Sequence, residues 1–269
     1  MPELPEIYNL AGQMDEALKG KTIREIQIRQ EKCLNMPANE FSTLVVGKKI
    51  RQVTPKGKWI FMKLEPDGYF LLSLGMGGNL LYHRPGDNIP EKYQVALTFD
   101  DNSRLSIGFW WFGYAHAVKD LKEHKMTHKL GVSPVDPAFT LEKFYGMLEG
   151  KKGSVKTALL DQSFIAGIGN VYAQDILFNA KLHPDRKIPT LTEGERRALF
   201  EAIRHDLDEA IALGGIAPEK DLYGKPGRLT IDDFKAGYRE GKPCPVCGTT
   251  IEKIKTGSTA SYICPKCQR

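Results

Sequence analysis

Residues 58–74 read KWIFMKLEPDGYFLLSL, two apolar runs separated by the turn residues Pro66, Asp67 and Gly68. Short runs of aromatic and branched aliphatic residues around such a turn predict a pair of β-strands. Further runs of this kind are Ile23–Ile28, KKIRQV at 48–53, QVALTF at 94–99 and RLSIGF at 104–109. No helical crossover lies between them, so residues 20 to 120 are predicted to form a β-rich module and not a parallel α/β sheet.

Helical periodicity occurs on both sides of this module. Apolar residues from Ile7 to Leu18 recur at helical spacing, which predicts a helix over 5–19 with Pro at its start and Gly past its end. The helical period returns from residue 140, and Thr192-x-x-Glu195 predicts a capping box for a helix that ends at a Gly-Gly pair. The predicted ranges are an N-terminal domain over 1–123, a linker over 124–137, a helical domain over 138–234 and a C-terminal segment over 235–269.

The chain of 269 residues has room for two domains and at least one sizeable core. Hydrophobic residues make up 41% and charged residues 26%, a globular composition that excludes wholesale disorder. No apolar run approaches the roughly 18 residues needed to cross a bilayer, and the start MPELPEIYNL lacks the features of a signal peptide. We therefore expect a cytoplasmic protein without a membrane partner.

The net charge of +5 is concentrated at the C-terminal end. From residue 235 onward seven basic residues stand against two acidic ones, whereas the preceding residues balance at 31 of each sign. Lys and Arg side chains that neutralise phosphates release condensed counterions, so a basic end fits contact with a polyanion such as nucleic acid. A solvated basic surface is the alternative on charge alone.

Four of the five cysteines occur as two pairs, Cys244-x2-Cys247 and Cys264-x2-Cys267. In a cytosolic chain such pairs favour a zinc site over disulfides. Four thiolates complete a tetrahedral site and leave no open position, so one structural Zn2+ is predicted. Its binding energy replaces the core that so short a segment cannot supply. The fifth cysteine, Cys33, is interpreted as a structural thiol.

The segment FIAGIGN at 164–170 joins two helix-like stretches, 156–162 and 170–177. Its glycines allow a close approach of the backbone. With Asn170 as N-cap, the first N–H groups of the second helix would suit an anion such as a DNA phosphate. A helix–helix corner packed on its own Ile and Leu residues explains the same spacing.

The first six residues, MPELPE, contain a candidate nucleophile. Aminopeptidase removal of Met1 would leave Pro2 with a free secondary amine whose pKa is near about 8, and such an amine is nucleophilic at neutral pH. Attack on a sugar C1′ would expel a damaged base and leave an iminium ion that permits elimination of the 3′ and then the 5′ phosphate. Glu3, at the start of a helix, could protonate the sugar ring oxygen or shuttle protons. An N-terminal cap with two solvated glutamates is the alternative.

Several motifs together resemble the formamidopyrimidine-DNA glycosylase and endonuclease VIII family, in the family's order and over essentially the whole chain. They are MPELPE at 1–6, Lys58 in a strand after Gly57, Leu74-Gly75-Met76, AGIGNVYA at 166–173 and the cysteine finger at 244–267. The resemblance implies an α+β multidomain fold. It comprises an N-terminal β-sandwich with an N-terminal helix, a C-terminal helix-two-turn-helix domain, a four-cysteine zinc-finger hairpin and a DNA cleft between the halves.

The resemblance also implies roles for residues at matching positions. Pro2 resembles the Schiff-base nucleophile, Glu3 the general acid, and Lys58 a phosphate-binding residue that assists elimination. Contacts to backbone phosphates near the flipped nucleotide are implied for Lys156 and Asn170. Met76 resembles the residue that fills the space left by base flipping. As alternatives, Met76 would belong to the core and Lys58 would be a surface charge.

The chain is an atypical member, because residues 108–113 read GFWWFG where the formamidopyrimidine branch typically has Asp-Pro-Arg-Arg-Phe-Gly. Trp110 replaces an Arg that would bond the orphaned cytosine, so hydrogen-bonding readout is lost and stacking is gained. Weak discrimination of the opposite base is therefore predicted. Trp110 and Trp111 are candidate DNA contacts, of which we expect one to reach DNA because adjacent strand residues face opposite ways. Packing of both in the sandwich is the alternative.

Two further segments depart from the family pattern. The hairpin sequence GSTAS at 257–261 lacks the family's phosphate-binding Arg, for which Lys255 would substitute as a point charge. The loop 216–227, which contains Tyr223, departs from the usual Thr-Thr-Leu-Arg-Asp that helps form the damaged-base pocket. The expected lesion is an oxidised or ring-opened base, with an atypical or bulky lesion as the alternative to standard 8-oxoguanine specificity.

These patterns predict a base-excision DNA glycosylase with abasic-site lyase activity. It would act as a monomer on damaged double-stranded DNA in the nucleoid, by β,δ-elimination, with no redox or nucleotide cofactor. A non-catalytic protein that binds damaged or distorted DNA is the main competing hypothesis, and an RNA-binding zinc-ribbon protein is a third. Pro2, Glu3 and Lys58 favour the enzyme, since binding alone requires no amine nucleophile.

Overall fold

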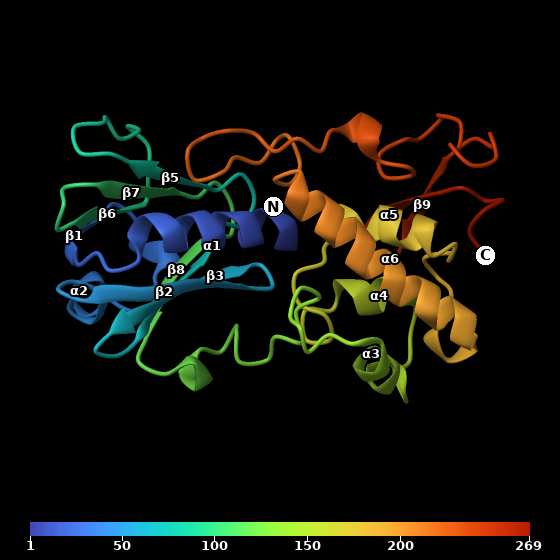
Figure 1. Ribbon diagram of the computed structural model, residues 1–269, viewed down its shortest axis with the longest axis horizontal. Helices are drawn as coiled ribbons and strands as arrows, with labels where there is room; N and C mark the ends of the chain where they lie inside the picture. The colour runs from blue at the N-terminus through green and yellow to red at the C-terminus, as the bar shows by residue number, and fades with distance from the viewer. The chain divides into compact units, whose positions relative to one another are not determined.

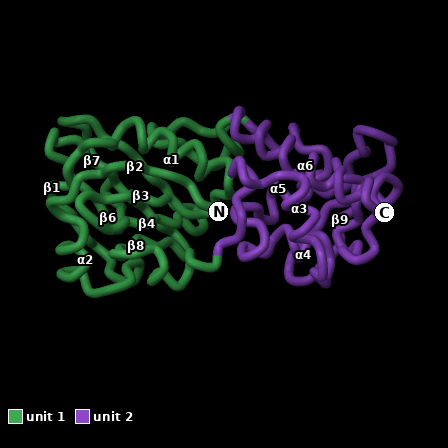
Figure 2. The backbone as a smooth tube through the Cα atoms, turned by 60° about the horizontal axis from the view of Figure 1, so that its bottom comes forward, with its two compact units in different colours: residues 1–129, 214–228 green, residues 130–213, 229–269 purple.

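The computed structural model describes residues 1–269, which form two compact units (Figure 2). Unit 1 comprises Met1–Lys129 and Gly214–Arg228, and unit 2 comprises Leu130–Leu213 and Leu229–Arg269. Unit 1 thus includes a segment far from the rest of it in sequence, residues 214–228, which we call the return loop. The domain ranges expected from the sequence are continuous and do not place the return loop with the N-terminal domain. Those ranges remain predictions.

Unit 1 is the expected β-sandwich with an N-terminal helix (Figure 1). Its elements are α1 (Leu4–Leu18), β1 (Ile23–Ile28), η1 (Glu31–Cys33), α2 (Ala38–Val45), β2 (Lys49–Lys56), β3 (Trp59–Glu65), β4 (Tyr69–Ser73), β5 (Asn79–His83), β6 (Val95–Phe99), β7 (Arg104–Gly108), β8 (Tyr114–Val118) and η2 (Leu121–Glu123). One antiparallel sheet has the order β1-β6-β7-β5 and the other the order β2-β3-β4-β8. A single hydrophobic core joins both sheets to α1 and α2.

Helix α1 confirms the helix predicted over 5–19 to within one residue. Glu3 is its N-cap and forms a capping box with Glu6, and a proline occupies the first turn. The apolar face packs against β2 and the core, with Leu10 and Met14 almost fully buried. Gly20 follows the helix at φ +85°, a left-handed conformation that glycine adopts without strain.

The sequence did not indicate β5, β8 or α2. Each of these strands has five residues, and β8 reads YAHAV, in which alanines stand where branched residues would mark a strand. Pairing with β7 and with β4 makes them strands. Helix α2 has eight residues and buries Phe41 and Val45, one turn apart. Tertiary contacts, and not local propensity, specify these three elements.

The start of β3 is anchored by an aromatic cluster around Trp59. The Trp59 ring stacks on Tyr114, with 6.0 Å between the ring centroids, and lies against His116 and His124. His116 Nδ1 is 2.8 Å from His124 Nε2, and His124 Nδ1 is 2.7 Å from Thr127 Oγ1. The first residues of the segment expected as a linker, 124–129, therefore pack into unit 1.

Unit 2 is helical and ends in a two-stranded hairpin. Its elements are α3 (Leu141–Leu148), α4 (Val155–Leu160), α5 (Tyr172–Asn179), η3 (Ile188–Thr190), α6 (Glu193–Ala212), η4 (Ile231–Asp233), β9 (Glu252–Thr256) and β10 (Thr259–Ile263). Thr192 and Glu195 form the predicted capping box of α6, which ends just before Gly214 as expected. None of the helices is both long and apolar enough to pass through a membrane.

The buried histidines of unit 1 should make its free energy of unfolding fall at acid pH. Burial lowers the pKa of His116 to about 4, and the charge of His124 acts in the same direction. The unfolded chain takes up this proton near pH 6.5 and the folded chain does not. We therefore expect His116 to reduce the free energy of unfolding by about 3 kcal/mol as the pH falls from 6.5 to 4.

Urea unfolding followed by tryptophan fluorescence measures this, because all three tryptophans belong to unit 1. The variant His116→Gln, which has no ionisable ring, should lose this part of the pH dependence. An equal change of stability with pH in both proteins would contradict the assignment.

Candidate functional site

The candidate catalytic residues Pro2 and Glu3 lie at the start of α1 in unit 1, and both are buried. The carboxylate of Glu6 organises this end of the helix. Its Oε2 accepts a hydrogen bond from the backbone N–H of Glu3 at 2.8 Å, and its Oε1 accepts one from the N–H of Ile216 at 3.0 Å. Glu6 is only 3% exposed, so these N–H groups and the helix N-terminus compensate a buried negative charge.

The return loop is fixed to α1 and β5 at several points. Gly215 lies so close to Glu6 that a Cβ atom there would be 2.4 Å from Oε1. Further along, Leu222 is fully buried in the core, its N–H donates to the side chain of Gln13, and its carbonyl accepts from Tyr82. In Figure 1 the orange segment after α6 accordingly runs back to β5. This loop is a fixed part of the N-terminal site.

The return loop also brings an acidic side chain to the chain start. Glu219 Oε1 lies 3.3 Å from the amine of Met1, and the Glu219 side chain is only 13% exposed. Its own backbone is held within the loop, since its N–H donates to Ile216 and its carbonyl accepts from Gly227. No local pattern in the sequence predicts a role for Glu219; the signal that the sequence offers is the departure of this loop from the family pattern.

Two loops at one end of the sandwich form an exposed apolar surface, which we call the aromatic tip and define as Met76, Trp110, Trp111 and Phe112. These side chains are 44%, 79%, 55% and 68% exposed. Met76 and Trp111 exchange two backbone hydrogen bonds of 2.8 and 3.1 Å, which lock the loops together. Large exposed apolar groups gathered in this way mark a binding surface.

The tip corrects one expectation and rules out two of the alternatives. Strand β7 ends at Gly108, so Trp110 and Trp111 lie in a loop and not in a strand. Both side chains are exposed, so the expected alternation of strand residues does not apply and neither ring packs in the sandwich. Met76 is likewise not a core residue. Phe112, which was not among the predicted DNA contacts, belongs to the same surface and takes the left-handed φ of +56°. Its place in the GFWWFG run was the available signal.

Lys58 lies in the two-residue turn between β2 and β3, not within a strand as expected, because Gly57 takes the positive φ of +58° that reverses the chain. It is partly exposed. Tyr223, in the return loop, is half exposed and makes an edge contact with Tyr82. Both side chains are thus accessible for binding.

Asn170 is not the N-cap of α5, contrary to expectation. The helix begins at Tyr172 with Val171 as N-cap, and the Asn170 side chain accepts a hydrogen bond from Gln174 Nε2 at 3.1 Å. The preceding glycine turn is braced by Gln162, which accepts from the N–H of Gly167 and donates to the carbonyl of Ile168. Gln162 therefore satisfies backbone groups of the glycine turn itself, and Gln174 donates to the Asn170 side chain.

The packing of this turn fits a helix–helix corner. Ile165, Ala166 and Ile168 are fully buried, so the turn contributes its own apolar residues to the core of unit 2. The role of Asn170 as a phosphate contact remains a prediction.

Lys156 is buried beneath the hairpin of β9 and β10. Its ammonium donates to Thr256 Oγ1 at 2.9 Å, to the carbonyl of Ala260 at 2.7 Å and to Ser261 Oγ at 2.7 Å. Burial lowers the pKa of Lys156 to about 8. All three donors of the lysine are used within the protein, so this side chain organises the hairpin. Its expected role as a phosphate contact stays a prediction.

Lys255 extends from β9 and is exposed, so its ammonium is accessible to a phosphate. Its neighbour across the hairpin is Ala260, whose carbonyl accepts the bond from Lys156. Lys156 therefore stabilises the β9–β10 hairpin, which carries the exposed Lys255.

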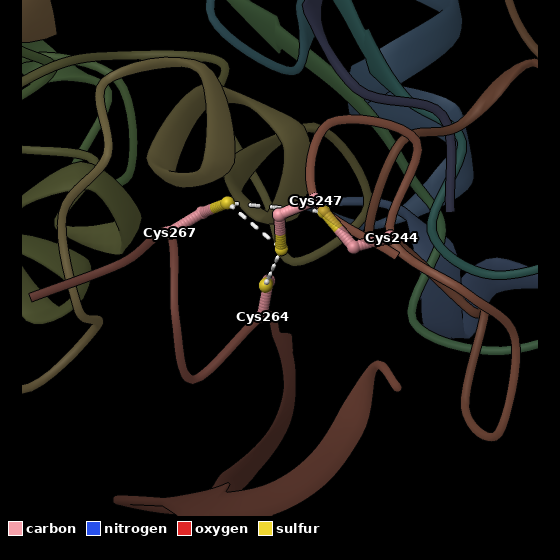
Figure 3. Close-up of side chains that lie close together, drawn as sticks. All are labelled: Cys244, Cys247, Cys264 and Cys267. Atoms are coloured by element: carbon pink, nitrogen blue, oxygen red, sulfur yellow. Dashed lines mark hydrogen bonds between the residues drawn. The ribbon is translucent and has the colours of Figure 1, made fainter. Parts of the chain in front are cut away.

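The four cysteines of the finger converge on one point (Figure 3). The sulfur of Cys247 lies 3.5 Å from those of Cys264 and Cys267, and the sulfurs of Cys244 and Cys267 are 3.9 Å apart. Zn–S bonds of about 2.3 Å in a tetrahedron place the sulfurs about 3.8 Å apart, so these residues fit Zn2+. Cys33 takes no part: its buried thiol donates to the carbonyl of Gln30.

Comparisons with protein-family models match three parts of the chain. The formamidopyrimidine-DNA glycosylase N-terminal domain matches residues 1–108, the formamidopyrimidine-DNA glycosylase H2TH domain matches 130–220, and the zinc finger found in FPG and IleRS matches 241–269. The last match, together with the four convergent sulfurs, confirms one structural Zn2+ as predicted.

Full-length relatives carry the same name. Formamidopyrimidine-DNA glycosylases of Listeria innocua and Oceanobacillus iheyensis are 34% and 36% identical to this chain; each alignment covers all of this chain, with 100% and 98% of the relative. MutM (FPG) from Thermus thermophilus is similar in structure, with 30% identity, a TM-score of 0.86 and coverage of 99% and 98%. Lactococcus lactis Fpg in complex with abasic-site DNA has the same fold, with a TM-score of 0.89 at 24% identity over 99% of each chain.

The zinc site generates a direct prediction. Purified protein should contain one equivalent of zinc, and Cys264→Ser should lose it, because three remaining thiolates no longer close the site. Metal analysis of the two proteins measures this. The matched control is Cys33→Ser, which alters a buried thiol outside the finger and should retain full zinc. Equal zinc in the Cys264 variant would contradict the assignment.

Proposed function

This chain belongs to the formamidopyrimidine-DNA glycosylase family, and from that membership we infer that it is a base-excision-repair DNA glycosylase. The observation that carries the inference is the buried, capped start of α1, with Pro2 and Glu3 side by side, in a chain similar to named glycosylases over its full length. Removal of Met1 gives Pro2 the free amine that the reaction requires.

We propose that Pro2 also provides abasic-site lyase activity. Its nitrogen attacks C1′ of the damaged nucleotide, and the resulting iminium withdraws electrons so that the 3′ and then the 5′ phosphate is eliminated. Glu3 protonates the opening sugar ring at O4′. Lys58, accessible in the β2–β3 turn, binds a phosphate during elimination.

The aromatic tip supports recognition by stacking. A flipped nucleotide leaves an unstacked base and an open space in the duplex, and indole and phenyl rings can fill such a space whichever base is present. Trp110 offers one N–H donor, too few to read a base edge by paired hydrogen bonds. We therefore propose that the enzyme discriminates weakly between bases opposite the lesion. Tyr223 and Lys255 are proposed as further DNA contacts, the first in the return loop and the second on the zinc finger.

We propose a monomer that acts on chromosomal DNA in the cytoplasm. The competing function is a non-catalytic protein that binds damaged DNA, which the exposed tip would also serve. An oxidised or ring-opened base is the proposed lesion, and an atypical or bulky base is the alternative that a stacking surface would accept.

Borohydride trapping on duplex DNA with one abasic site tests the lyase. We expect a covalent adduct that peptide mapping assigns to residue 2, because borohydride reduces the iminium to a stable amine. The matched control is an N-terminally extended protein, in which the Pro2 nitrogen is an amide and no adduct should form. Glu3→Gln should slow base excision by at least about a hundredfold. Tight binding without an adduct would favour the non-catalytic protein.

The tip should contribute affinity without opposite-base preference. Trp110→Ala is expected to weaken binding to lesion-containing duplex by about 1–3 kcal/mol, the range for loss of one stacked base. Excision rates for one lesion opposite each of the four bases should differ by less than about tenfold. A larger preference for cytosine, or unchanged binding by the variant, would contradict the assignment.

A further inference from the structure

The carboxylate of Glu219 forms an ion pair with the amine at the chain start. It lies 3.3 Å from the Met1 amine, and its side chain is largely shielded from water. In a polypeptide, only Cα and the carbonyl carbon separate the nitrogens of consecutive residues, which are therefore about 3–3.6 Å apart. Removal of Met1 moves the free amine from the Met1 nitrogen to the Pro2 nitrogen, a distance similar to the 3.3 Å between the Met1 nitrogen and Glu219 Oε1. A change of rotamer allows the Glu219 side chain to follow the amine.

The neighbouring carboxylates have other tasks. Glu3 and Glu6 form the capping box of α1, and the second oxygen of Glu6 binds the N–H of Ile216 in the return loop. Glu219 differs because its backbone holds the loop together while its side chain contacts the terminal amine. A carboxylate in this position attracts a positive charge at the Pro2 nitrogen.

We infer that Glu219 acts on the Pro2 nitrogen as counter-charge and proton acceptor during Schiff-base formation, an inference that rests on the proposed function. When the nitrogen lone pair forms a bond to C1′, the bond from C1′ to the base breaks and its electron pair leaves with the base, which takes a proton from water. The nitrogen then carries an N–H proton and a positive charge.

That proton must leave before the nitrogen can form a double bond to C1′. The Glu219 carboxylate accepts it, and the released electron pair forms the C=N bond as the C1′–O4′ bond opens. O4′ takes its proton from Glu3. The product is a cationic iminium, and with its proton lost to solvent the carboxylate of Glu219 faces this cation. Glu3 therefore protonates O4′, and Glu219 accepts the proton from the Pro2 nitrogen.

The test compares processed wild-type protein with Glu219→Gln and Glu219→Asp. Two quantities are measured: the rate of borohydride-trapped adduct on an abasic duplex, and the affinity for a duplex with a tetrahydrofuran site, which has no aldehyde and cannot form a Schiff base. We expect Glu219→Gln to slow trapping at least about tenfold with affinity changed less than about twofold, and Glu219→Asp to restore part of the rate. The matched control is Glu16→Gln, an exposed acid on α1, which should leave both quantities unchanged.

The outcomes separate this inference from the proposed function. If wild-type protein forms an adduct at residue 2 and Glu219→Gln forms it equally fast, the role of Glu219 is refuted while the lyase stands. Parallel loss of trapping and of tetrahydrofuran-duplex binding in Glu219→Gln would also refute it, since it would indicate that the residue only holds the loop. Absence of any adduct at residue 2 in wild-type protein would overturn both.

Discussion

The arrangement of the N-terminal site depends on one buried carboxylate, that of Glu6. One of its oxygens binds the N–H of Glu3 and fixes the first turn of α1; the other binds the N–H of Ile216 and fixes the return loop. A buried carboxylate without donors would be costly, so each of these bonds requires the other elements to be in place. The absence of a side chain at Gly215 completes the fit, because a Cβ atom there would overlap Glu6. The position of the candidate nucleophile thus follows from a contact between residues 210 positions apart.

The candidate DNA contacts of the two units use different physical chemistry. In unit 1 the aromatic tip offers rings and a thioether, whose attraction to bases comes from burial and stacking and is insensitive to salt. In unit 2 the finger offers exposed charge, and its strand pair is held from beneath by the buried ammonium of Lys156. Affinity from charge weakens as salt rises, whereas stacking persists. In the proposed function the finger would hold the DNA backbone and the aromatic tip would sense an opened base step.

Local patterns in the sequence were sufficient for several features. The α1 helix, the capping box of α6 and the four-cysteine site each depend on residues close together in the chain, so spacing alone predicts them. Strands β5 and β8, helix α2 and the contacts of Glu219 depend on distant partners and have no such pattern. Placement of Trp110 and Trp111 failed for a related reason: the end of β7 is set by its ladder to β5 and not by the apolar run, which continues beyond Gly108. The prediction of Asn170 as the cap of α5 is wrong because the helix begins only at Tyr172, and the Asn170 side chain accepts a hydrogen bond from Gln174 instead.

The return loop also has a consequence for biosynthesis. In the folded chain the Met1 amine, which an aminopeptidase must bind, is paired with Glu219, and Pro2 is buried, although Met1 itself is 51% exposed. A ribosome that adds about 5–20 residues per second needs on the order of 10–40 s to reach Glu219 after the first residues are made. During that interval the partner of the N-terminus does not yet exist, and the methionine is open to removal. The order of synthesis thus separates maturation of the nucleophile from closure of its site.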